Sequence, residues 1–343
     1  DRGLLDRHLP SAAAALRWCE EAGDLDDDGL LEYRTRSRRG YRNQGWKDAF
    51  DAIAHEDGSL AEPPVATVEL QGYWYAARLA MAELCDVAGR AAEADRQRTE
   101  AAALRARVEE RFWLDDTGTY ALALDGGKRL VRSASSNPGH LLWCGLPTPA
   151  RAARVAERML AADLWSGWGV RTLAAGHARY NPLSYQCGSV WPHDCALLAA
   201  GLARYRLRDA AAQVAGGLLE AAACFEHERL PELFCGIDRR HGPPVPYQRA
   251  NVPQAWAAAA PILLAQLFLG LVADAPAGTI WLDPWLPDWL PTLALRGVSI
   301  GGAELDVVLR RDGGQTVVDG ATHARLAIAS GTPPAPLWGA PLP

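Results

Sequence analysis

The sequence predicts an all-α fold, an (α/α) barrel of paired helices whose connecting loops gather at one end, with a small C-terminal β appendage. Three observations predict it. Ala- and Leu-rich segments with helical spacing continue to about residue 272. The loops between them are long and rich in Trp, Gly, Pro and Tyr. Residues 293–328 then alternate apolar and polar side chains, with Gly pairs at turn positions.

The helical segments begin and end at residues that favour helix termini. The first one begins with Ser11 and ends before Gly23, and Gly89 separates the two longest. A closed barrel of six helix pairs needs more helices than we find, so we expect a barrel domain over 1–292 that lacks its N-terminal helices. The predicted helices span 11–22, 65–87, 91–112, 138–144, 148–162, 189–207, 209–226 and 252–271.

The C-terminal region is expected to be a β element followed by a loose tail. LALRGVSI, AELDVVLRR and QTVVDG alternate like short strands, which places a β element at 293–331, packed on the barrel. Residues 332–343 are rich in Pro, so we expect a loose tail there. The uncharged segment 255–273 approaches the length of a membrane span, but Pro261 and its many Ala favour a buried helix.

Composition and charge exclude several classes of protein. The 343 residues are 49% hydrophobic and 22% charged, which excludes a disordered chain. A net charge of -6 gives no attraction to phosphate backbones, so we expect neither a nucleic acid nor a membrane as partner. The 7 Cys form no C-x-x-C pair, which indicates reduced thiols in a cytoplasmic protein rather than disulfides or zinc. The 13 Trp against 5 Phe suit either sugar stacking or wide helix packing.

Two carboxylates stand out as candidates for acid–base chemistry. Hydrolysis of an acetal needs one protonated carboxyl group and one carboxylate, in surroundings that tune their pKa values. Asp48 lies in NQGWKDAFD, between aromatic residues and beside Lys47, one of only two Lys. Glu232 lies in the apolar loop LPELFCG. The alternative for each is a carboxylate that caps a loop. Asp51 and Glu69 are weaker candidates of the same type.

Four polar–aromatic clusters at the starts of helices suit a sugar-binding pocket. A hydroxyl-rich ligand needs many hydrogen-bonding side chains and a few flat apolar walls. Core packing with a helix cap is the alternative for any one cluster. The clusters are ELQGYW at 69–74, WSGWGVR at 165–171, YNPLSY at 180–185 running on to GSVWPHD at 188–194, and PQAW at 253–256.

The order of these motifs resembles that of a known family. NQGWKD, GYWYAA, SGWGVRTLA, YNPLSY, GSVWPHD, LPELFCG and PQAW follow one another as in bacterial amylo-α-1,6-glucosidase or glycogen-debranching-enzyme-like proteins. Those proteins are similar to the wider clan of (α/α)6-barrel glycosidases, which includes mannosylglycerate hydrolases, glucosidase I-like enzymes and trehalases. The resemblance covers roughly residues 10 to 310. It implies an inverting, exo-acting α-glycosidase that hydrolyses a small α-glucoside or α-mannoside or an oligosaccharide end.

The resemblance also implies roles for individual residues. Asp48 matches the general acid and Glu232 the general base of the clan. Lys47 or Arg171 would bind an acidic aglycone or a sugar hydroxyl, unless each pairs with a nearby carboxylate. His193 has no Cys or His at metal spacing, so we expect it to make hydrogen bonds. The residues predicted to bind substrate are Trp46, Lys47, Gln71, Tyr73, Trp168, Arg171, Tyr185, Trp191, His193, Gln254 and Trp256.

The sequence departs from the family in two motifs and in its extent. It reads YQCG at 185–188 where relatives read YHNG, and ANVPQAW at 250–256 where relatives read ACSPQAW. Both changes lie beside the expected pocket, so sugar specificity is not carried over. Relatives also have a β-sandwich and further barrel helices before the region that matches Asp1. We therefore expect a second chain or another segment to complete the barrel, or the helices to pair differently.

The segment 24–35 begins like a calcium loop, but its ligand pattern is incomplete. Its twelfth position is Thr35, where a calcium loop has a bidentate Glu. An acidic turn is therefore the favoured interpretation, and we expect no cofactor. The residues of this weak calcium candidate are Asp24, Asp26, Asp28 and Glu32.

A run of arginines follows directly and resembles an anion-binding patch. Because the acidic stretch precedes it, we expect mutual neutralisation instead. The run consists of Arg34, Arg36, Arg38, Arg39 and Arg42.

Two other functions stay open from the sequence. One is a non-catalytic carbohydrate-binding or partner subunit, which keeps the pocket and needs another chain to complete the barrel. The other is a lyase or epimerase, which needs a proton-transfer pair; Tyr185 with His193 is the candidate pair.

Overall fold

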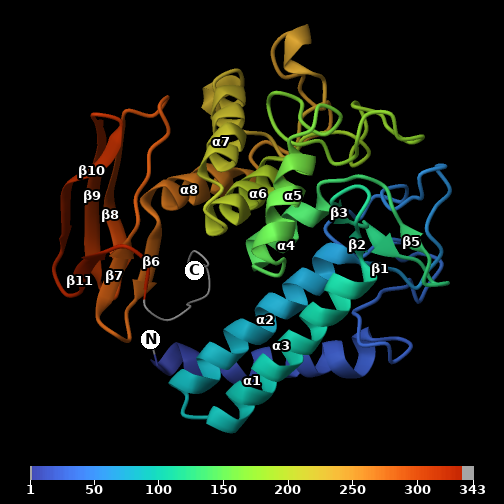
Figure 1. Ribbon diagram of the computed structural model, residues 1–343, viewed down its shortest axis with the longest axis horizontal. Coiled ribbons are helices and arrows are strands. Elements are labelled where there is room, and N and C mark those ends of the chain that lie inside the picture. Colours follow the sequence, from blue (N-terminus) through green and yellow to red (C-terminus); the bar gives the residue numbers. More distant parts are fainter. Residues whose placement is uncertain (1, 334–343) are drawn as a thin grey trace.

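Four inner helices pack side by side in chain order in the structure, a computed structural model that describes residues 2–333 (Figure 1). Helix α2 packs against α4, α4 against α6, and α6 against α8. The two ends of this arc, α2 and α8, make no comparable contact, so residues 2–333 do not close a ring. The inner helices are α2 (Val68–Val87), α4 (Asn137–Cys144), α6 (Pro192–Arg204) and α8 (Ala255–Leu269).

Outer helices cover the inner ones, as the predicted pairing requires. Helix α3 packs on α2, α5 on α4 and α7 on α6, while α1 lies against α2. Within residues 2–333 there are eight α-helices, the predicted number. The remaining four are α1 (Arg2–Trp18), α3 (Ala91–Arg111), α5 (Pro149–Met159) and α7 (Arg208–Ala222).

The first helix is longer than predicted. It begins at Arg2 instead of Ser11 and runs through Pro10. Leu9 and Leu16, seven residues apart, are both buried on one face of this helix. Burial of that face offsets the backbone hydrogen bond that Pro10 cannot make.

Other helix ends follow the expected chemistry. Thr148 caps α5 by accepting a hydrogen bond from the backbone N–H of Arg151 at 3.4 Å, with Pro149 in the first turn. Helices α4 and α8 end at Gly145 and Gly270, both in the left-handed conformation that glycine adopts without strain.

The β part is larger than predicted and begins directly after α8. Strands β6 (Leu271–Asp274), β7 (Thr279–Leu282) and β11 (Ala327–Ser330) form one sheet in the order β11–β7–β6. The predicted loop 274–292 therefore contains a strand, whose Ile280 and Leu282 alternate into the core. The predicted tail lies, from residue 334 onward, outside the described residues.

A second sheet forms the rest of this β region. It is an antiparallel meander in the order β10–β9–β8, and buried Leu305, Val307 and Leu309 of β9 join the main core. The three strands are β8 (Thr292–Ile300), β9 (Ala303–Asp312) and β10 (Gln315–His323).

Short strands and isolated bridges tie the long loops together at one end of the helices. The bridges join Ser135 to Leu173, Arg171 to Val190, Val190 to Phe234, and Phe234 to Pro246. They bring together loops that lie far apart in sequence. The short strands are β1 (Ala66–Thr67), β2 (Trp113–Leu114), β3 (Thr119–Tyr120), β4 (Ala123–Leu124) and β5 (Leu130–Val131).

None of the helices in the described part of the chain combines the length and the apolar character that a membrane crossing requires. The uncharged helix α8 has 15 residues and buries Leu264, Leu267 and Phe268. All 7 cysteines are free thiols.

Candidate active site

Asp48 lies on an irregular loop, residues 43–51, that buried amide groups hold in shape. The Asn43 side chain donates to the carbonyl of Ala49 at 2.6 Å. The Gln186 side chain accepts from the Ala49 N–H at 2.8 Å and donates to the Trp46 carbonyl at 3.2 Å. Asp48 itself is exposed to solvent. The loop thus presents the Asp48 carboxylate while its neighbours are fixed.

Glycine at position 45 lets this loop approach the helix below it. A Cβ atom at Gly45 would lie 2.8 Å from Oε1 of Glu69, a buried residue of α2. Any larger residue would lift the loop that carries Asp48.

Glu232 lies on a second loop and is almost fully buried. Its Oε1 accepts a hydrogen bond from the Tyr185 hydroxyl at 2.7 Å. Its Oε2 accepts from the backbone N–H of Asn251 at 3.0 Å and from the Asn251 side chain at 2.8 Å. All three groups donate, so they suit an ionised carboxylate that acts as an acceptor.

The loop of Glu232 is locked against the loop that precedes α6. Phe234 and Val190 exchange both backbone hydrogen bonds, at 2.9 and 3.0 Å. A Cβ atom at Gly236 would lie only 1.7 Å from the carbonyl oxygen of Gly188, so only glycine permits this approach. The position of Glu232 is therefore determined by backbone contact.

Tyr185 connects the two candidate carboxylates. Burial raises the pKa of the Tyr185 hydroxyl, and the hydrogen bond and charge of Glu232 and then the charge of Asp48 raise it further. A charge acts in this way only over a short range, so both carboxylates lie near the same hydroxyl. The structure brings Asp48 and Glu232, 184 residues apart in sequence, to one side of the molecule.

A continuous aromatic wall runs between these two loops. Trp191 is fully buried and its indole N–H donates to the Tyr185 carbonyl at 3.0 Å. Its ring meets those of Trp46, Tyr185, His193 and Trp256 at 4.9–5.7 Å between centroids. His193 stacks flat on Trp256 at 4.0 Å, and burial lowers the pKa of His193 to about 4.

Buried polar atoms in and beside this wall are left with spare hydrogen-bonding capacity. Within residues 2–333 four of them have no partner, which makes them available to water or to the hydroxyl groups of a ligand. They are Trp46 Nε1, Trp168 Nε1, His193 Nδ1 and Asp194 Oδ2.

A family model for the mannosylglycerate hydrolase MGH1-like glycoside hydrolase domain matches residues 1–234. The chain belongs to this family. The comparisons do not show the narrower debranching-enzyme likeness that the motifs suggested. A search of curated proteins gives no match.

Solved structures resemble this MGH1-like chain in fold. A GH78 family rhamnosidase of Bacillus sp. GL1 matches 99% of this chain and 31% of its own, with TM-score 0.68 and 16% identity. A sialidase matches 92% of this chain and 29% of its own, with TM-score 0.66 and 15% identity. GH63 mannosylglycerate hydrolase from Thermus thermophilus matches 76% and 72%, with TM-score 0.57 and 16% identity. The chain spans less than half the length of the first solved structures that it matches, 46%, 29% and 47%.

The MGH1-like chain also has a buried polar relay behind the wall, part of which the sequence did not reveal. The Tyr73 hydroxyl lies 2.6 Å from Nδ1 of His140, and Nε2 of His140 lies 2.6 Å from the Asp194 carboxylate. Burial alone would raise the pKa of Asp194, but the hydrogen bond and charge of His140 hold it below its usual value. Trp46 stacks on His140 at 5.5 Å. The signal for His140 was a single basic residue within apolar α4.

Several residues predicted to bind sugar are instead occupied by the backbone. Gln71 exchanges hydrogen bonds with both backbone groups of Leu31, at 2.7 and 2.8 Å. Arg171 is buried, and its guanidinium donates to the carbonyls of 162, 163, 165 and 236. Gln254 accepts from the N–H of Ala255 at 2.7 Å and so caps α8. Trp168 is buried under the guanidinium of Arg239, 4.3 Å from its ring.

Lys47 is likewise turned inward, away from solvent. It is fully buried, and its ammonium donates to the Thr172 carbonyl at 2.5 Å. Burial lowers the pKa of Lys47 to about 8, although the nearby charges of Asp194 and Glu69 oppose this shift. The alternative that the sequence left open, a structural role beside carboxylates, fits this position better than contact with an aglycone.

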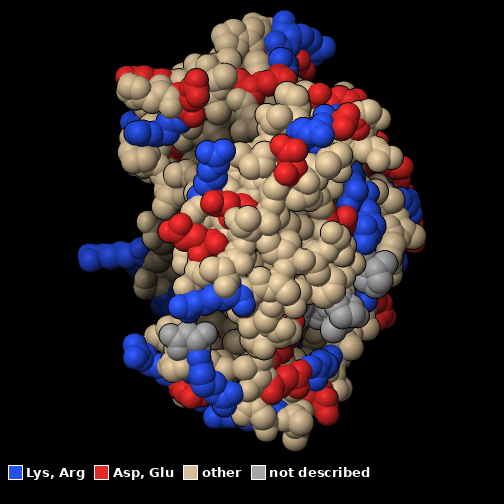
Figure 2. Space-filling view, turned by 90° about the vertical axis from the view of Figure 1, so that its left-hand side faces the viewer, with Lys and Arg blue, Asp and Glu red and all other residues tan. Residues whose placement is uncertain are grey.

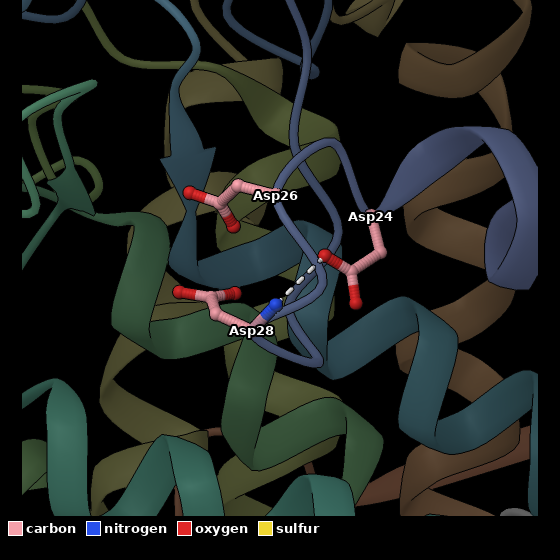
Figure 3. Close-up of side chains that lie close together, drawn as sticks. All are labelled: Asp24, Asp26 and Asp28. Atoms are coloured by element: carbon pink, nitrogen blue, oxygen red, sulfur yellow. Dashed lines mark hydrogen bonds between the residues drawn. The ribbon is translucent and has the colours of Figure 1, made fainter.

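The acidic loop after α1 has a cation of its own. Asp24, Asp26 and Asp28 converge as Figure 3 shows, with ligand atoms within 4.8 Å of one another. The Lys128 ammonium lies 2.8 Å from Asp26 and 2.7 Å from Asp28 and also contacts Glu32. A lysine therefore stands where the calcium interpretation placed an ion, which favours the acidic turn.

Proposed function

We propose that this domain is an inverting α-glycosidase with Asp48 as general acid and Glu232 as general base. Asp48, protonated, donates its proton to the glycosidic oxygen. Glu232, ionised, removes a proton from a water on the opposite face of the sugar, and the anomeric centre inverts in one displacement. The account requires a separation of about 6.5–9.5 Å between the two carboxyl groups, which leaves room for that water.

The observation that carries the proposal is the position of Tyr185 between the two carboxylates. Glu232 receives three hydrogen bonds from donors, which suits a base that is charged before the reaction. Asp48 is exposed on its loop, which suits a group that must meet an incoming leaving group. The two differ in surroundings as an acid–base pair requires.

We infer that the substrate is a small α-glucoside or α-mannoside, or the end of an oligosaccharide cleaved from its terminus. Exposed Trp256 and half-buried Tyr185 offer flat faces at the edge of the wall, and Trp46 offers an indole N–H. We also propose that the helix arc is part of an (α/α) barrel and that the free thiols reflect a cytoplasmic location.

The test is hydrolysis of a panel of aryl α-glycosides and α-linked disaccharides by the chain and its variants. Asp48→Asn and Glu232→Ala should each lower kcat by at least about 100-fold while sugar binding is kept, because each removes one proton-transfer group. Glu226→Ala is the matched control, since Glu226 is exposed on the same loop. Full activity in either catalytic variant would contradict the assignment.

A second candidate function is a non-catalytic carbohydrate-binding or partner subunit. The observation that favours it is the bare outer face of α8, where Ile262 is 71% and Trp256 38% exposed on a helix without charge. Another segment or a second chain would cover this face. Analytical ultracentrifugation beside the activity panel separates the two functions: binding of sugar without turnover by the chain alone supports the subunit.

A further inference from the structure

Four exposed arginines between the acidic loop and the loop of Asp48 have no partner in the described chain. Among residues 2–333 none of them makes an ion pair or a side-chain hydrogen bond, whereas Arg42 reaches the Ala61 carbonyl at 2.8 Å. We call them the arginine run; they are Arg34, Arg36, Arg38 and Arg39.

The expected neutralisation of this run by the preceding acids is wrong. The carboxylates of Asp26, Asp28 and Glu32 are paired with Lys128 from a distant loop. Arg111 of α3 supplies a second cation to Asp28 at 3.6 Å. The acidic loop therefore has its counter-charges, and the arginine run keeps its own charge.

This arrangement differs from the charge pattern on the opposite side of the molecule. On the face that carries the C-terminal strands, basic and acidic side chains alternate around a broad uncharged area (Figure 2). There Arg310 pairs with Asp312 at 3.0 Å and with Asp319 at 3.4 Å. The chain has a net charge of -6, so an unpaired basic run is a local feature and not a consequence of overall composition.

The arginine run borders a hollow of about 280 Å³ with a tryptophan wall. Arg34 and Arg36 line it beside Trp18, Ser37 and the Gln44 amide. The Trp18 ring is 57% exposed, so its flat face is open to a ligand. Trp18 lies where α1 passes into a π-helical turn, Cys19–Gly23.

The one acid that lines the hollow does not oppose an anion there. Glu32 is buried, its Oε1 contacts Lys128, and its Oε2 accepts from the N–H of Leu25 at 3.3 Å. The hollow thus combines two free guanidinium groups with a flat apolar wall. Guanidinium groups bind carboxylates in a bidentate manner, and indole faces bind sugar rings.

The hollow and the candidate acid belong to one locked segment. Gln44 lines the hollow and lies four residues before Asp48. Beside Gln44, Asn43 holds the segment from both sides: it accepts from the Tyr33 hydroxyl at 3.3 Å and donates to the Ala49 carbonyl. A ligand in the hollow therefore lies beside the loop that presents Asp48.

We propose that the arginine run and the Trp18 hollow bind an acidic oligosaccharide whose sugar units carry carboxylates. Four guanidinium groups within six residues suit several charges along a chain better than the single charge of a small acid. The proposal rests on the proposed function in one respect: the same glycan would extend to Asp48 for cleavage.

The experiment measures binding of a galacturonate hexamer to the chain by calorimetry, with maltohexaose as the neutral probe of equal length. The hexamer should bind with a Kd in the micromolar range that rises at least tenfold when salt is raised from about 50 mM to 500 mM, since exposed charges are screened. Replacing all four arginines of the run by Ser should raise that Kd at least tenfold. Trp18→Ala should raise it several-fold.

The matched control replaces four other exposed arginines by Ser, namely Arg7, Arg90, Arg229 and Arg296. This variant has the same net charge as the first, so a specific site requires its Kd to stay within twofold of the wild type. Equal binding of maltohexaose, or equal effects of the two quadruple variants, would overturn the proposal. Tighter binding of a single-stranded DNA hexamer than of the acidic glycan would also overturn it.

Binding and turnover separate this proposal from the proposed function. If the chain hydrolyses neutral α-glycosides but does not bind the galacturonate hexamer, the acidic-glycan site is wrong and the glycosidase stands. If the hexamer binds through the arginine run but no α-glycoside is hydrolysed, the site stands and the glycosidase is wrong.

Discussion

The two lysines of the chain lie in two loops that treat a positive charge in opposite ways. Lys47, in the loop of Asp48, is fully buried, and burial lowers its pKa to about 8. Lys128 lies beside the acidic loop, where partial burial opposes its charge but hydrogen bonds to three carboxylates outweigh that effect and raise its pKa. One charge is held in the interior at a cost, and the other is stabilised by its neighbours.

The difference shows that a charge near the candidate active site serves position rather than stability. Lys47 donates to the Thr172 carbonyl and so fastens the Asp48 loop to the segment before α6. Lys128 joins a turn to a loop 96 to 102 residues away and neutralises it. The following predictions break or sharpen this comparison.

The largest expected effect is on the pH dependence of stability. The pKa of Lys47 is lowered in the folded state, so between pH 8 and 10.5 the unfolded chain binds more protons than the folded one. The cost of burying the charge is present in full below pH 8 and is relieved as pH rises. A shift from 10.5 to about 8 corresponds to about 3 kcal/mol.

Urea unfolding of the wild type and of Lys47→Met at pH 7 and pH 10 measures this effect. The free energy of unfolding of the wild type should rise, relative to that of the variant, by up to about 3 kcal/mol between the two values. For Lys128→Met the sign is opposite: the stabilisation by Lys128 is present below pH 10.5 and is lost only at higher pH. A difference that is independent of pH for Lys47 would contradict the comparison.

A slightly smaller effect is expected on catalysis by Lys47→Met. Loss of the bond to Thr172 should displace Asp48 and lower kcat about 100-fold, equal to about 2.7 kcal/mol, on glycosides with poor leaving groups. A glycosyl fluoride needs no proton from Asp48, so its hydrolysis should change little. Lys128→Met is the control and should retain the wild-type kcat on both. Equal losses on both substrates would instead indicate general damage to the fold.

The smallest effect is expected on stability at pH 7 for Lys128→Met. Removing the ammonium leaves Asp26, Asp28 and Glu32 close together without their cation. Because the site is partly exposed, the expected loss is only about 1 kcal/mol. Millimolar calcium should restore that loss in the variant and leave the wild type unchanged in thermal unfolding. No loss in the variant, or equal stabilisation of both proteins by calcium, would contradict the role given to Lys128.

The helices and the candidate carboxylates were predictable from the sequence for local reasons. Apolar spacing and terminal residues such as Thr148 and Gly270 specify helix positions within a few residues. Asp48 and Glu232 stood out because a charge in an apolar loop needs a reason. Tertiary packing overrode the local signal at α1, where Leu9 and Leu16 extend the helix through Pro10.

Side-chain partners across long sequence distances were not predictable. Lys128 reaches the acidic loop and His140 links Tyr73 to Asp194 only because the chain folds, and no local pattern encodes either contact. For the same reason Gln71 and Arg171, which read as pocket residues, are bound to distant backbone groups. Residue type predicted the chemistry of the site, whereas the direction of each side chain required the fold.

The most direct test of the acid–base pair is the configuration of the first product. Proton NMR of an aryl α-glycoside during hydrolysis by the wild-type chain, recorded before mutarotation, should show the β-anomer of the released sugar. Glu232→Ala should abolish its formation. Release of the α-anomer would mean that a carboxylate attacks the sugar directly, and this result would contradict the roles given to Asp48 and Glu232.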